Sequence, residues 1–81
     1  MPQSERANNI KKLLQWISES EEGRTVQACL AYVINEITEL GATEPTARKY
    51  LEALGKANLI TYKQPFWSIT KAGRDWLERH A

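Results

Sequence analysis

The apolar residues near the start of the chain recur with the spacing of one helix face. They follow the i, i+3, i+4, i+7 pattern, and they are Ile10, Leu13, Leu14 and Ile17. Ser4 suits the N-cap of such a helix, and Glu5 places a carboxylate near its positive end. The pattern predicts a first helix over about 4–18, followed by a polar connector that contains Gly23.

A second apolar series falls on one side of a helical wheel. Its members are Val26, Cys29, Leu30, Val33, Ile34, Ile37 and Leu40. Thr25 can cap a helix here, and Gly41 stands where a residue in the left-handed conformation would end it. We therefore predict a second helix over about 25–40.

A third helical pattern begins shortly after that glycine. Thr43 can cap a new helix, Glu44 suits its positive end, and Pro45 is tolerated in a first helical turn. The apolar side of this helix would consist of Ala47, Tyr50, Leu51 and Leu54. The pattern predicts a third helix over about 43–57, behind a very short turn.

The last third of the chain changes from helical to strand composition and back. Residues 59–63 and 66–70 are rich in β-branched and aromatic side chains, so they predict a short two-stranded hairpin. Thr70 can cap a final helix over about 71–80. The predicted fold is mainly α with a small β-hairpin, in the order helix, helix, tight turn, helix, hairpin, helix.

Two stretches of the chain carry a family resemblance. The first is VINEITELGATEPTARKYLEALGKANLI, residues 33–60. It resembles the recognition core of small prokaryotic winged helix-turn-helix regulators, of the arsenical-repressor, multiple-antibiotic-resistance and related archaeal types. The second, WSITKAGRDWL at 67–77, is similar to the pattern that leads out of their wing into a closing helix. The resemblance implies a winged helix-turn-helix fold, with which the predicted element order agrees.

The resemblance also implies double-stranded DNA as the partner. In the resembling regulators the helix after the tight turn enters the major groove, so here the recognition helix would be 43–57 and the wing 62–67. Carried over by position, the candidate DNA-binding residues are Thr43, Glu44, Thr46, Arg48, Lys49, Glu52, Lys56, Lys63 and Gln64. The implied function is that of a small transcriptional regulator that binds DNA sequence-specifically.

The side-chain chemistry of these positions is compatible with such roles. The Arg48 guanidinium can donate two hydrogen bonds to guanine O6 and N7, and the hydroxyls of Thr43 and Thr46 can bond phosphate oxygens. The lysines would contact phosphates, and Gln64 at the hairpin tip could reach a sugar or a minor-groove edge. Arg48 is therefore the candidate for reading a base.

Acidic residues on the same helix leave a second function open. Glu44 and Glu52 would repel phosphates unless each carboxylate accepts a hydrogen bond from cytosine or from a neighbouring arginine. Arg48, Glu52 and Lys56 are spaced i, i+4, i+8 and could form an ion-pair ladder on a solvated helix. The alternative function is a winged-helix protein–protein interaction module of a replication or transcription assembly.

The three tryptophans suggest contacts within and between copies. The first and last helices often form the dimer interface in the resembling regulators, which implies a homodimer with Trp16 and Trp76 at its interface. Alternatively, both rings cover a small core. In the hairpin, strand alternation places Trp67 and Ile69 on the core side and leaves Phe66 more exposed.

Length and charge refine this picture. A chain of 81 residues, 42% of them hydrophobic, has room for a single domain over 1–81. Its 11 Lys+Arg nearly balance its 10 Asp+Glu, which does not by itself indicate a nucleic-acid partner. Residues 1–42 hold four basic and six acidic side chains, however, whereas residues 43–81 hold seven basic and four acidic. The half that contains the predicted recognition helix is the basic half.

Cysteine and histidine are too few for several kinds of site. The only cysteine, Cys29, lies on an apolar helix face, and the only histidine, His80, lies next to the C-terminal residue. We therefore expect no enzyme, metal or cofactor. No stretch reaches the roughly 18 apolar residues of a membrane span, and residues 1–15 carry charges where a signal peptide is apolar. These features predict a cytoplasmic protein with no membrane partner.

Overall fold

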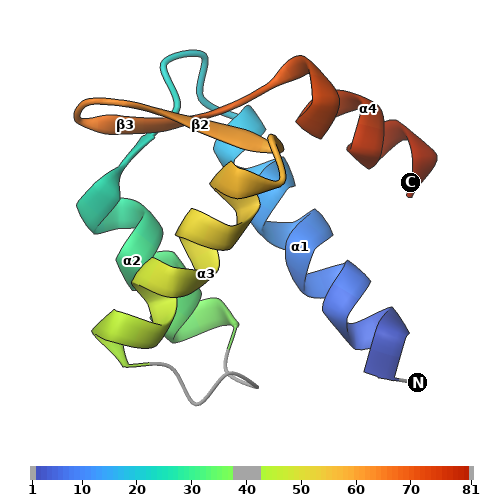
Figure 1. The fold of residues 1–81 in the computed structure, drawn as a ribbon, viewed down its shortest axis with the longest axis horizontal. Coiled ribbons are helices and arrows are strands. Elements are labelled where there is room, and N and C mark those ends of the chain that lie inside the picture. The colour runs from blue at the N-terminus through green and yellow to red at the C-terminus, as the bar shows by residue number, and fades with distance from the viewer. Residues whose placement is uncertain (1, 38–42, 81) are drawn as a thin grey trace.

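The computed structural model of the chain describes residues 2–37 and 43–80, with side chains from residue 7 onward. Within these ranges the chain is mainly helical with a small antiparallel sheet, as predicted (Figure 1). In chain order the elements are α1 (Pro2–Ser18), β1 (Arg24–Thr25), α2 (Val26–Glu36), α3 (Glu44–Lys56), β2 (Ile60–Lys63), β3 (Phe66–Ile69) and α4 (Lys71–Arg79).

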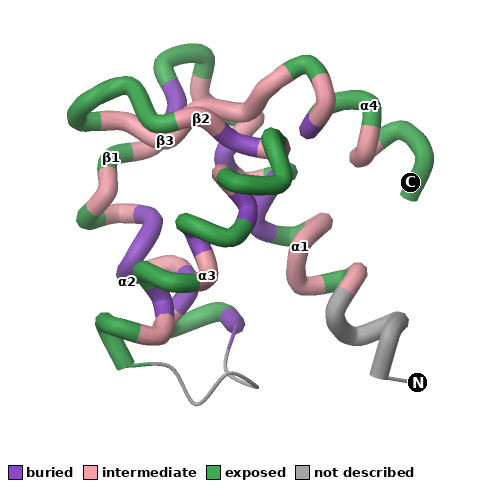
Figure 2. Tube along the Cα trace, viewed as in Figure 1, coloured by how far each residue is buried: buried purple, intermediate pink, exposed green. Residues whose placement is uncertain are grey.

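The core lies where α1, α2 and α3 meet beneath the sheet. Figure 2 shows the buried segments of these helices turned toward one another. The buried hydrophobic residues are Leu13, Leu14, Ile17, Cys29, Leu30, Val33, Ile37, Ala47, Leu51, Leu54 and Ile60. Ten of them, all but Ile60, come from the three helical series predicted from the spacing of apolar residues, so helical periodicity locates most of the core.

The sheet has one strand more than the two-stranded hairpin that the sequence predicts. Its order is β1-β3-β2, and both pairings are antiparallel. Arg24 pairs with Trp67 and Thr25 pairs with Phe66, directly after the connector that we expected to contain Gly23. A two-residue strand is too short to show alternation in a sequence, so only its pairing with β3 reveals it.

The second helix is shorter than predicted. It ends at Glu36, and Ile37 leaves the helical conformation with φ −110° and ψ 67° while its N–H still donates to the Val33 carbonyl oxygen at 3.0 Å. The Ile37 side chain remains fully buried, which is why the apolar spacing continues past the end of the helix. The remainder of the predicted helix, residues 38–40, and its predicted end at Gly41 lie outside the described residues.

Two of the four predicted N-caps are confirmed. The hydroxyl oxygen of Thr25 accepts the Ala28 N–H at 3.2 Å, and that of Thr70 accepts the Gly73 N–H at 2.9 Å. Thr43 is at the N-cap position of α3 but makes no side-chain cap bond. Ser4 is wrong as a cap, because α1 already begins at Pro2, and proline is favoured in the first helical turn.

The loop between α1 and β1 is fastened to the sheet at Gly23. This glycine has φ +92°, and a Cβ there would collide with the carbonyl oxygen of Trp67. Glu22, the residue before Gly23, accepts a hydrogen bond on its carbonyl oxygen from the Ser68 hydroxyl at 3.1 Å. The connector that the sequence predicts around Gly23 is therefore held closely against β3.

Candidate nucleic-acid interface

The two sides of α3 differ sharply in burial. Ala47, Leu51 and Leu54 are buried on the side that faces α2 and the sheet. Of the nine predicted DNA-binding residues, Thr46 is half-buried, and the others are exposed: Thr43, Glu44, Arg48, Lys49, Glu52, Lys56, Lys63 and Gln64. The predicted contact residues are thus accessible to a large partner.

Several of these side chains surround a groove between α2, α3 and the hairpin. The groove has a volume of about 660 Å³. Its polar lining consists of Thr25, Gln27, Arg48, Glu52, Tyr62 and Gln64. Its apolar lining consists of Val26, Leu30, Leu51, Pro65 and Trp67. The structure therefore brings Arg48, Glu52 and Gln64 together, although they come from two different elements.

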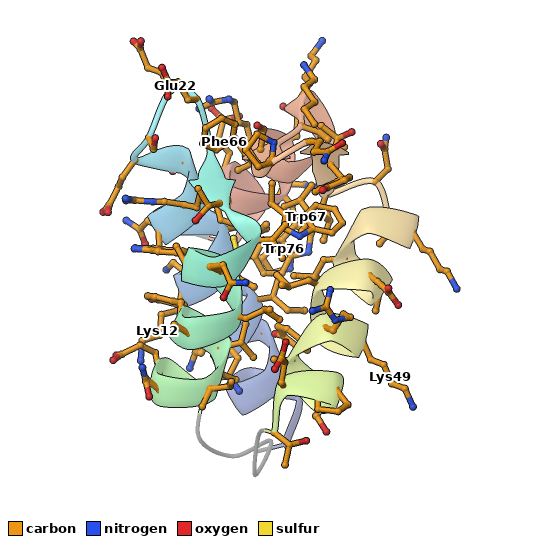
Figure 3. All side chains as sticks on the ribbon, turned by 90° about the vertical axis from the view of Figure 1, so that its left-hand side faces the viewer. Lys12, Glu22, Lys49, Phe66, Trp67 and Trp76 are labelled. Carbon is orange, nitrogen blue, oxygen red and sulfur yellow. The ribbon has the colours of Figure 1, made fainter. Side chains whose placement is uncertain are left out.

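A second, shallower hollow lies on α3 itself. It is lined by Glu44, Pro45, Arg48, Lys49 and Glu52. Figure 3 shows Lys49 pointing outward from α3 and Trp67 between the hairpin and the helices. Arg48 and Glu52 line both hollows, so they lie on the boundary between the groove and the outer face of the helix.

Arg48 is paired with Glu44. Its Nη2 lies 3.2 Å from the Glu44 Oε1, one helical turn earlier, and both side chains are more than half exposed. The ladder considered from the sequence does not form, since neither Glu52 nor Lys56 has an ion pair within residues 7–37 and 43–80. An exposed i, i+4 pair contributes only about 0.3–0.5 kcal/mol, so a stronger ligand can displace it.

The hairpin turn is tied to the start of α2. The Val26 N–H donates to the Pro65 carbonyl oxygen at 3.1 Å, and β1 pairs with β3 directly beside it. Gln64 on this turn and Lys63 at the end of β2 are exposed. The predicted wing over 62–67 is therefore a short, anchored wall of the groove, with Gln64 lining the same groove as Arg48.

Two groove residues were not singled out from the sequence. Tyr62 is 49% exposed, and its ring centroid lies 5.3 Å from that of Trp67 in a tilted arrangement. Gln27 lies in the first turn of α2, and its side-chain amide has no hydrogen-bond partner in the part of the chain that the structure describes. Strand alternation groups Tyr62 with buried Ile60, so the sequence pattern alone does not predict that Tyr62 is exposed.

The two candidate interface tryptophans are partly buried, both pack against the hydrophobic core, and each belongs to a separate aromatic stack. The Trp16 ring stacks on Tyr32 with centroids 4.2 Å apart, and the Arg24 guanidinium carbon lies 4.6 Å from the Trp16 ring centroid. The Trp76 ring stacks on His80 with centroids 3.8 Å apart. Both tryptophans therefore have contacts within one chain, and the homodimer stays a prediction.

Groups with catalytic or metal-binding chemistry are sparse on this face. Cys29 is fully buried, and burial raises the pKa of its thiol to about 12, against a small opposing effect of the positive charge of Arg24. In the described ranges, no group of three or more His, Cys, Asp or Glu residues could hold a metal ion. The described helices also include none that is long and apolar enough to cross a membrane.

Comparisons of the chain with protein-family models, with curated proteins and with solved structures give no match. The function is therefore inferred from the geometry of α3, the groove and the hairpin.

Proposed function

We propose that the chain is a winged helix-turn-helix domain that binds double-stranded DNA sequence-specifically, with α3 as the recognition helix. The observation that carries this proposal is the position of Arg48, exposed midway along the outer face of α3 and beside the hairpin. The sheet order β1-β3-β2, with α2 and α3 packed below it, supports the winged-helix assignment.

The dimensions of α3 suit a DNA groove. Its 13 residues span about 20 Å at 1.5 Å per residue, and the major groove is about 12 Å wide and admits an α-helix. With α3 in the groove, the guanidinium of Arg48 would leave Glu44 and donate to guanine O6 and N7. Lys49, Lys56 and Lys63 would then contact phosphates and supply affinity without sequence preference.

The groove gives the hairpin a role that differs from a long wing. Because its turn is bonded to the start of α2, the hairpin lies across α2 and α3 (Figure 1) and does not project freely from them. Gln64 and Gln27 line the same groove as Arg48 and would face the DNA backbone beside the base that Arg48 contacts, where their amide groups can donate to phosphate oxygens. We propose these two glutamines as positioning contacts.

As a homodimer, the proposed regulator would bind two DNA half-sites, one with each copy of α3. Recognition helices of such dimers lie in successive major grooves about 34 Å apart. The Cα trace of one chain measures 30 Å along its longest axis, a length of the same order as that spacing. Trp16 and Trp76 are the proposed interface residues, and the mechanism would be occupancy of a promoter.

The test of this proposal compares Arg48→Ala with Lys63→Ala. Each protein is titrated against a random-sequence duplex and against the duplex that the unchanged chain selects from that pool. We expect Arg48→Ala to lose about 5- to 100-fold in affinity on the selected duplex and much less on the random one, as for a lost guanine contact. Lys63→Ala should weaken both by a similar factor. Equal losses for both variants on both duplexes would contradict the base-reading role of Arg48.

The apolar lining of the groove favours one other function. Val26, Trp67 and Pro65 are at least partly exposed and offer a surface on which an apolar side chain of a protein partner could pack, as an interaction module of a replication or transcription assembly would require. This alternative predicts a stable complex in a pull-down and DNA binding no stronger than a non-specific background. Selection of a defined operator from random DNA would argue against it.

A further inference from the structure

One stripe of α3 alternates in charge, and the structure distinguishes its two carboxylates. Glu44, Arg48 and Glu52 are spaced one helical turn apart, so Arg48 has a carboxylate on either side. Its guanidinium contacts only the first, at 3.2 Å from Glu44 Oε1. Side chains on a helix lean toward its N-terminus, and an acid four residues before a base is the favourable order. The preference for Glu44 therefore follows from helix geometry.

The environment of this ion pair makes it easy to exchange. The side chains are 52% and 62% exposed, so water and salt screen their attraction. A phosphate that approaches Arg48 also approaches the carboxylate of Glu44, 3.2 Å away, and is repelled by its negative charge, whereas the O6 and N7 acceptors of a guanine carry no net charge. A guanine can therefore outcompete Glu44 more readily than a phosphate can.

We propose that Glu44 determines specificity by holding Arg48 back from phosphates and releasing it to a guanine. This inference rests on the proposed DNA-binding function of α3. Glu44 acts through Arg48 and is a positioning residue, whereas Glu52, with no ion pair among residues 7–37 and 43–80, acts only by repelling phosphates. The two carboxylates on one helix face thus have different effects on DNA binding.

The experiment uses the full chain and a set of neutral variants. Glu44→Gln, Arg48→Gln and the double variant are titrated against a random-sequence duplex by fluorescence anisotropy at several salt concentrations, and against the duplex selected by the unchanged chain. Glu52→Gln, alone and with Arg48→Gln, is the matched control, because it removes the same charge from the same stripe. Thermal unfolding of each variant checks that α3 remains folded without its first-turn acid.

We expect Glu44→Gln to bind the random duplex about three- to tenfold more tightly at low salt, with a log–log salt slope steeper by about 0.9, the effect of one added phosphate contact. The selected duplex should gain less, so that discrimination falls. In the Arg48→Gln background the effect of Glu44→Gln should shrink to that of Glu52→Gln. This dependence on Arg48 is the signature of a positioning role.

Failure of the inference alone and failure of the proposed function give different results. If Glu44→Gln has the same effect with and without Arg48, or the same effect as Glu52→Gln, Glu44 acts by repulsion alone while DNA binding stands. If the unchanged chain and all variants fail to bind the random-sequence duplex at low salt, so that no duplex can be selected, the proposed function and the inference fall together.

Discussion

The thiol of Cys29 shows how strongly a single buried side chain departs from its behaviour in water. Its Sγ lies 3.7 Å from the carbonyl oxygen of Arg24, to which it donates, and no part of the residue is exposed. Desolvation raises the pKa of the thiol from 9.0 to about 12. The thiolate, which is the reactive form, is therefore scarce in the folded chain at any ordinary pH.

We expect two consequences of this raised pKa. In the folded protein Cys29 should react with a thiol reagent at pH 8 far more slowly than in urea, and equal thiol reactivity with and without urea would contradict this expectation.

The stabilisation linked to the protonated thiol should be complete below about pH 9 and decline as the pH rises toward 12, because the thiol of the unfolded chain loses its proton first. The raised pKa of Tyr32, caused first by burial, acts in the same direction. Urea unfolding at pH 8 and pH 10 measures this decline in the free energy of unfolding, and equal values at the two pH values would contradict it.

At the scale of elements, α1 is joined to α2 and β1 by an aromatic and cationic cluster. Trp16 stacks on Tyr32 with an interplanar angle of 13°, and the Arg24 Nε donates to the Trp16 carbonyl oxygen at 3.1 Å. Arg24 also pairs with Glu19 at 3.6 Å. This cluster holds the end of α1 next to β1, the strand that pairs with β3. Since the hairpin lines the groove, the cluster also helps to fix the position of that groove wall.

The coupling between these rings can be measured in a double-mutant cycle. We expect Trp16→Ala to lower the free energy of unfolding by about 2–3 kcal/mol, since its ring is partly buried. The Trp16→Ala and Tyr32→Ala effects should be non-additive by about 0.5–1.5 kcal/mol, as for stacked aromatic pairs. Trp76→Ala with Tyr32→Ala is the control and should be additive. Additivity in the Trp16 pair would show that the stack contributes nothing beyond burial.

The helices, in which apolar residues recur over several turns, could be predicted from the sequence. The strand β1, which exists only through its pairing with β3, could not. Leu13, Val33 and Leu51 lie in the core as their helical spacing predicts. Arg24 and Thr25 gave no strand signal, because two residues show no period and β1 exists only through its pairing with β3. Continued apolar spacing likewise extended the second helix too far.

The candidate site likewise has some features that the sequence predicts and others that only the tertiary structure reveals. Exposure of Arg48 and Lys49 follows from the amphipathic pattern of α3, and the sequence sufficed to predict it. The groove depends on how the hairpin turn meets the start of α2, a contact between residues about 40 positions apart. Gln27 and Tyr62 therefore entered the site only with the tertiary structure.

At the scale of the whole molecule, the proposed function depends on where charge lies and not on how much there is. The chain has a net charge of +1, and its second half holds the basic excess. The cations proposed to meet DNA, among them Arg48, Lys49 and Lys63, lie on α3 and the hairpin, whereas Glu21 and Glu22 lie in the connector before β1. A surface arranged in this way would bind DNA weakly and with strong dependence on salt.

The most direct test of the central claim is the salt dependence of duplex binding by the unchanged chain. Fluorescence anisotropy of a labelled random-sequence duplex is followed at two or more salt concentrations, with the mass of the complex checked by light scattering. We expect binding at low salt that weakens with a log–log slope of about −2.7 to −4.5, the value for three to five phosphate contacts at roughly −0.9 each. Absence of binding at low salt, or binding indifferent to salt, would contradict a DNA-binding role for α3.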